Sequence, residues 1–194
     1  MKKTTFAFLP AIALALATVA AAPALRAQSA MTAGSASVPA KTYNQLLSMQ
    51  EHELVPLAEA MPADKYNFAP SNGNFKGVRT FAEQLTHIIH ANYAFFGDAA
   101  GITPASMPKM SDLKTKDQIV QALKDSFAFG HRAIGTLTAQ NAFEPVKPMD
   151  GVSTRAGMVS FAMIHMNDHF GQLVEYLRMN GIVPPSSQPM PMHR

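Results

Sequence analysis

Four stretches of this sequence place apolar side chains three and four residues apart, the spacing that lines one face of an α-helix. No stretch alternates apolar and polar residues as a strand does, and no internal repeat stands out. A helix that is apolar on one face must bury that face against a neighbour. The pattern therefore predicts an all-α fold, a four-helix bundle with helices of about 20 to 27 residues.

Capping and helix-breaking residues set the expected boundaries of these helices. Thr80 and Thr115 each begin a capping box, with a glutamate or glutamine three residues later. Ser153 or Thr154 is expected to cap the last helix. The helices are expected over about residues 41–61, 81–97, 116–137 and 154–180, with loops rich in proline and glycine between them.

The last of these helices carries His165 and His169 in the middle of its apolar face. Residues four apart lie almost above one another on a helix, so both imidazoles are expected to face the core. A single core histidine is usually satisfied by a backbone carbonyl. Two on one buried face must both find partners, and a divalent metal binds neutral imidazoles at this spacing. Metal binding and hydrogen bonding within the core both remain open interpretations of the pair.

A third metal ligand would come from a facing helix, and the second helix offers His87 and His90. Neither lies on the strongest apolar face of that helix. His87 shares a face with Gln84, Ala91 and Ala94, whose small or amide side chains would let another helix approach closely. Periodicity therefore favours His87 over His90 only slightly.

A resemblance to a known family is carried by three segments, Gly77–His87, His165–Leu173 and Leu177–Arg178. Together they are similar to the DinB family, also described as DinB/YfiT-like metal-binding four-helix bundles. The resemblance covers residues 41–183, which we take as the domain. One departure from the family pattern is the extra histidine, His90, one turn from His87.

This resemblance implies a divalent-metal site formed by His87, His165 and His169. It also implies an up-down-down-up order of helices and frequent dimers, so that a homodimer is expected. The expected ion is zinc or nickel. Glu83, Asp168 and Gln172 are within a turn of the expected ligands, and are candidates either for orienting them or for ordinary polar roles.

Two other enzyme motifs that involve histidine or serine match this sequence less well. A zincin protease needs glutamate directly after the first histidine of its pair, where this chain has Met166. Ser160 lacks the surrounding glycines of a nucleophile elbow. These observations argue against a zincin protease and a serine hydrolase.

The first 27 residues are expected to be an export signal, a further departure from the family pattern. Lys2 and Lys3 precede the charge-free apolar run Phe6–Leu25, and cleavage after Ala27 or Ala24 fits the small residues that follow. The mature chain is therefore expected to be periplasmic or secreted, without membrane attachment. A retained membrane anchor is the alternative, because about twenty apolar residues can span a bilayer.

The two remaining terminal segments are expected to lack regular structure, and the overall charge limits the kinds of partner that the chain can bind. Residues 28–40 are expected to be a flexible leader, and residues 184–194 a disordered tail. Without the signal, 13 of the 16 basic side chains remain beside 13 acidic ones, so charge does not favour nucleic acid. The absence of cysteine excludes a thiolate nucleophile and a zinc site built on cysteine.

Two functions remain for such a chain. Three histidines would leave a coordination position open, as catalytic metals require. The family resemblance implies that some relatives use the metal to activate a small thiol for transfer or isomerisation. The first expectation is therefore a metal-dependent transferase or hydrolase acting on an unidentified small substrate. The alternative is a non-catalytic metal-binding module of the cell envelope, favoured by export into an oxidising space where small thiols are scarce.

Overall fold

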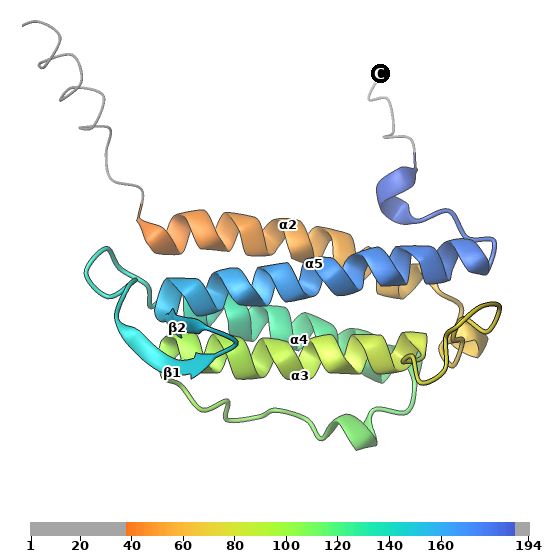
Figure 1. The fold of residues 1–194 in the computed structure, drawn as a ribbon, viewed down its shortest axis with the longest axis horizontal. Helices are drawn as coiled ribbons and strands as arrows, with labels where there is room; N and C mark the ends of the chain where they lie inside the picture. The colour runs from red at the N-terminus through yellow and green to blue at the C-terminus, as the bar shows by residue number, and fades with distance from the viewer. Residues whose placement is uncertain (1–37, 189–194) are drawn as a thin grey trace, which may run out of the picture. The chain divides into compact units, whose positions relative to one another are not determined.

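The computed structural model describes residues 38–188, and four helices make up most of these described residues. They are α2 (Pro39–Ala60), α3 (Phe81–Ala100), α4 (Lys116–Ile134) and α5 (Arg155–Met179) (Figure 1). The expected all-α four-helix bundle is confirmed. The predicted signal at residues 1–27, residues 28–37 of the predicted leader and residues 189–194 of the predicted tail lie outside the described residues.

The helices begin where the capping residues indicate. Thr80 Oγ1 accepts a hydrogen bond from the backbone N–H of Glu83 at 3.2 Å, and Glu83 Oε2 accepts one from the N–H of Thr80 at 2.8 Å. Thr115 forms the same capping box with Gln118 at the start of α4. Thr154, rather than Ser153, caps α5. The first helix starts at Pro39, inside the predicted leader, because proline suits the first turn of a helix.

Contacts between the helices define their order as up-down-down-up. The hydroxyls of Tyr43 and Ser160 lie 3.2 Å apart near the starts of α2 and α5, which therefore run parallel. Tyr176, near the end of α5, donates a hydrogen bond at 2.9 Å to the carbonyl of Arg79, just before α3, so α5 and α3 are antiparallel. Lys116, at the start of α4, donates hydrogen bonds to the carbonyls of Glu59 at 2.6 Å and Met61 at 2.9 Å at the end of α2, so α4 is antiparallel to α2. The order that the family resemblance implied is thus confirmed.

Because α3 and α4 run in the same direction, residues 101–115 must return along the bundle to connect them. This crossover segment follows the outer side of α3 (Figure 1). It contains a short 3₁₀ helix, η2 (Met110–Asp112), and begins at Gly101, whose φ of 68° closes α3 in a left-handed conformation. The crossover places Met110 near the first turns of α3.

The core is built from large apolar side chains of all four helices, with Leu47, Phe81, Phe96, Phe127 and Leu173 fully buried. A Cβ added at Gly130 would lie 2.8 Å from the ring of Phe96 and 3.0 Å from the side chain of Leu47. Glycine at this position is therefore what allows α4 to approach α3 and α2 so closely.

The loop expected before the last helix contains a β-hairpin that the sequence pattern did not reveal. Strands β1 (Pro145–Met149) and β2 (Val152–Thr154) pair antiparallel around Asp150 and Gly151, whose φ angles are 49° and 83°. Positive φ at both positions is typical of a two-residue hairpin turn. The strands were missed because they are short and β1 contains two prolines.

The predicted disordered tail is wrong at its beginning. Residues Pro185–Ser187 form a 3₁₀ helix, η3, and the Ser187 hydroxyl accepts a hydrogen bond at 3.2 Å from Arg178 of α5. This contact and packing against α2 hold the segment. Among the described residues, none of the helices combines the length and apolar character needed to cross a membrane.

Candidate metal centre

Three histidines from two helices meet at one point in the bundle. His165 and His169 are one turn apart on α5, and His87 lies opposite them on α3. His165 Nε2 is 3.0 Å from His87 Nε2 and 3.1 Å from His169 Nε2. The ligand nitrogens of all three residues lie within 4.8 Å of one another. The structure thus brings together His87, His165 and His169, the three residues that the family resemblance singled out.

The spacing of these nitrogens fits a shared metal ion. Two nitrogens bound to one zinc at about 2.0–2.1 Å, at angles between octahedral and tetrahedral, lie roughly 2.9–3.4 Å apart. The two contacts of His165, at 3.0 and 3.1 Å, fall in that range. The cluster therefore needs little rearrangement to become three ligands of a divalent ion.

Hydrogen bonding alone leaves this cluster poorly satisfied. The Nδ1 atoms of His165 and His169 are buried and have no hydrogen-bond partner in the described part of the chain. If Nδ1 carries the ring proton it is a buried donor without an acceptor, and if Nε2 carries it, Nδ1 is a buried acceptor without a donor. Either tautomer costs free energy, on the order of 1–3 kcal/mol for each unpaired group. In addition, His165 Nε2 carries either one proton or one lone pair, so hydrogen bonding can satisfy only one of its two contacts with the other rings. This convergence argues against the interpretation of His165 and His169 as ordinary core histidines.

The surroundings keep the three imidazoles neutral. Burial is the largest cause that lowers the pKa of His87 to about 4, with the charges of Arg79 and His165 acting in the same direction. Burial likewise lowers the pKa of His165 to about 4 and lowers that of His169, while Asp168 opposes the shift in both. Neutral imidazole is the form that binds metal, so all three rings are ready to do so near pH 7.

A chain of polar side chains joins α3 to α5 one turn from the cluster. Gln84 Nε2 donates a hydrogen bond at 2.7 Å to Gln172 Oε1, and Gln172 Nε2 donates one at 2.9 Å to Asp168 Oδ2. Gln84 is buried, although it lies off the main apolar face of α3. These bonds set the position of His87 against the pair on α5. Asp168 and Gln172, candidates from the sequence, thus contact each other rather than the histidine rings.

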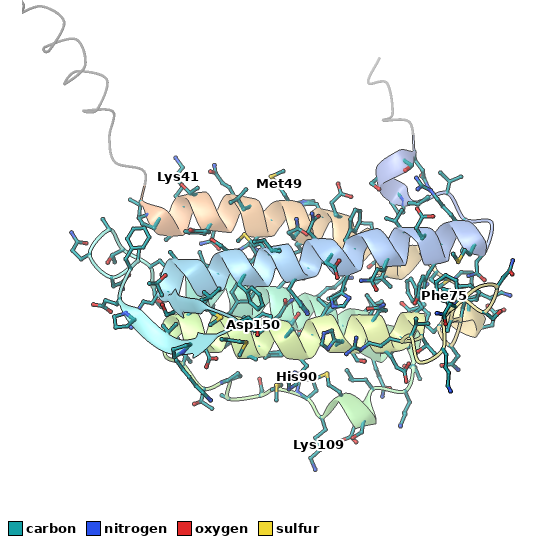
Figure 2. The ribbon with its side chains drawn as sticks, in the orientation of Figure 1. Lys41, Met49, Phe75, His90, Lys109 and Asp150 are labelled. Atoms are coloured by element: carbon teal, nitrogen blue, oxygen red, sulfur yellow. The ribbon has the colours of Figure 1, made fainter. Side chains whose placement is uncertain are left out.

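The other histidines among residues 38–188 lie outside the cluster. His90 is exposed and points from α3 toward the crossover segment that carries Lys109 (Figure 2). His52 is exposed on α2, as the sequence indicated. His131 is half-buried, and its two ring nitrogens contact the side chains of Asn44 and Glu51. The structure thus places His87, and not His90, against the pair on α5.

An open cavity of about 500 Å³ borders the cluster at His87. Its lining combines the loop before α3, the exposed side of α3 and the crossover segment. The lining includes the side chains of Arg79, Glu83, Thr86, His87, His90 and Met110. A small molecule in this cavity would lie beside the ring of His87.

Two residues near the cluster were missed by reasoning from the sequence. Phe95 contacts His165 edge-on, with ring centroids 5.3 Å apart, and so helps to hold that ring. Arg79 lines the cavity, and its charge acts on all three histidines. Phe95 looked like any core aromatic residue. Arg79 precedes a helix cap, where no periodicity indicates which way a side chain points.

Comparison with known proteins identifies the family and the fold of this chain. The model of the DinB superfamily matches residues 46–173, a range that includes all three histidines. Among solved structures, a DinB-like protein from Bacillus subtilis is 20% identical, and the match covers 75% of this chain and 99% of that chain with a TM-score of 0.57. At this identity the likeness concerns the fold alone. The search of curated proteins found no match.

Proposed function

The chain belongs to the DinB superfamily, and we propose that it is an exported metal-dependent transferase or hydrolase that acts on a small substrate. His87, His165 and His169 would hold the ion. The observation that carries the proposal is the convergence of three histidine nitrogens, two of them at 3.0 and 3.1 Å from the third.

A catalytic role is supported by the space beside the cluster. Three protein ligands leave room for a further ligand on most divalent ions, and the cavity of about 500 Å³ gives a small molecule access to His87. When bound, a divalent metal supplies Lewis acidity to a substrate or a water molecule. The protein contributes neutral imidazoles and the polar contacts between α3 and α5 that keep them in position.

The second candidate is a metal-binding module of the cell envelope without catalytic activity. One observation favours it. The carboxylates nearest the cluster are already engaged, since Glu83 caps α3 and Asp168 accepts a hydrogen bond from Gln172. Neither is positioned as a free general base, so catalysis would depend on the metal and on groups that the substrate brings.

Elemental analysis of the protein purified from its native compartment tests the metal first. One equivalent of zinc or nickel is expected. A protein that contains no metal and is unaffected by added chelator would contradict the proposal. The metal-loaded protein is then screened for transfer and hydrolysis of small substrates. Activity should disappear in His165→Ala and persist in His52→Ala, which removes an exposed histidine of α2 that is not part of the cluster. Full metal occupancy without any activity would favour the second candidate.

A further inference from the structure

Arg79 is an exposed cation at the cavity. Its side chain lines the same cavity as His87. Within residues 38–188 its guanidinium forms no ion pair and no hydrogen bond. Arg79 is thus a free cation next to a candidate metal centre.

The backbone of Arg79 is held in place on both sides. Its carbonyl accepts a hydrogen bond at 2.9 Å from the Tyr176 hydroxyl of α5. The next residue, Thr80, begins α3 and is fixed by its capping box with Glu83. The cationic side chain therefore starts from a defined point at the edge of the cavity.

Neither Glu83 nor Asp168 forms an ion pair with Arg79 in the described part of the chain. Glu83 lines the cavity but accepts a hydrogen bond at 2.8 Å from the N–H of Thr80, and Asp168 accepts one from Gln172. A divalent ion on the three histidines would add two further positive charges beside Arg79. Such a site attracts an anion, and guanidinium binds carboxylate through two parallel hydrogen bonds.

We propose that Arg79 binds the carboxylate of a small carboxylic acid, which is the substrate class of this site. This inference rests on the proposed function, because the reacting end of that acid is placed at the three histidines. A longer substrate also has room, since a second cavity of about 790 Å³ is lined in part by the same Glu83, Thr86 and Met110.

The test compares two thiols of equal size on the mature protein loaded with cobalt(II). A thiol binds cobalt directly and changes its visible absorption, which gives a readout that does not depend on activity. The probes are 3-mercaptopropionate, which carries a carboxylate, and its neutral amide. Wild-type protein should bind the carboxylate about fivefold more tightly than the amide, the effect of one partly exposed ion pair.

Arginine variants assign the preference to Arg79. Arg79→Gln should keep its cobalt and lose the preference, while Arg79→Lys should keep part of it. Arg132→Gln is the matched control, because it removes the same charge from α4 outside the cavity and should behave like wild type.

Each contrary result has a separate meaning. If wild-type protein binds the two thiols equally, or if Arg79→Gln keeps the preference for the carboxylate, Arg79 does not bind the carboxylate. Either result would leave the assignment of the metal centre unaffected. Loss of cobalt in Arg79→Gln would make the residue structural and also overturn the inference. If wild-type protein binds no cobalt before any thiol is added, the proposed function fails, and this inference fails with it.

Discussion

At the scale of single residues, His165 is the centre of the site. Its Nε2 contacts those of both His87 and His169, whereas no contact of hydrogen-bond length joins the latter two. Phe95 packs edge-on against its ring. Removing His165 therefore takes away the nitrogen on which the other two converge.

The first prediction concerns metal stoichiometry. His165→Ala, His169→Ala and His87→Ala should each abolish stoichiometric metal binding, because two remaining histidines seldom hold a divalent ion firmly. His90→Ala should retain the metal, since His90 is exposed on α3 and lies outside the cluster. Elemental analysis and calorimetric titration measure the outcome. Loss of metal in His90→Ala with retention in His87→Ala would mean that the third ligand is assigned to the wrong residue.

The second prediction concerns the pH dependence of stability in the metal-free protein. The folded state holds the pKa of His87 and His165 at about 4, below the ordinary value of 6.5. Between these values the unfolded chain binds more protons than the folded one, so stability must fall as pH drops from about 6.5 toward 4. Above pH 6.5 both states hold these rings neutral and the effect disappears.

Urea unfolding of the metal-free protein between pH 7 and pH 4 measures this effect. The double variant His87→Gln/His165→Gln should lose less stability over the same range, because its glutamines do not titrate. Equal pH dependence in the two proteins would show that these rings are not kept neutral by the fold.

At the scale of elements, the approach of α4 to α3 depends on one glycine. The ring of Phe96, which a Cβ at Gly130 would meet at 2.8 Å, is fully buried in the core. On α5, by contrast, a Cβ at Gly171 would have no atom within 4 Å. The two helical glycines thus form a matched pair of sites for the same substitution.

The third prediction uses that pair. Gly130→Ala should destabilise the protein by about 1 kcal/mol, because an overpacking cost of about 1–3 kcal/mol exceeds the gain in helix propensity of about 1 kcal/mol. Gly171→Ala should stabilise it by up to about 1 kcal/mol, since only the propensity changes. Chemical denaturation of both variants measures the difference. Stabilisation by Gly130→Ala would show that the helices separate easily at this contact.

At the scale of the whole molecule, export remains a prediction for residues outside those that the structure describes. It rests on Lys2, Lys3 and the apolar run Phe6–Leu25. Mass spectrometry of the mature protein should find an N-terminus near Gln28. Leu14→Arg, which places a charge in the apolar run, should prevent processing and export. An intact Met1 in the cell-envelope fraction of wild-type cells would favour a membrane anchor instead.

The four helices and the spacing of His165 and His169 could be read from the sequence, because these features are local. Apolar period, capping boxes and a four-residue interval act within one or two turns of a helix. The hairpin at Asp150 and Gly151 was missed, although that dipeptide is a turn signal, because its strands are too short to show alternation. Local pattern therefore predicted the long elements and not the short ones.

What the sequence alone determined was the fold class and half of the site, the histidine pair on α5. The apolar periodicity of the second helix hardly distinguished His87 from His90 as the third metal ligand, and the family resemblance was needed to choose between them. The choice depends on how α3 is turned and shifted against α5, which is set by contacts between distant residues such as Gln84 with Gln172. The place of Arg79 at the cavity follows from another such contact, that of its carbonyl with Tyr176. Only the tertiary structure decided these points, because the register between two helices is a property of their packing and not of either sequence segment.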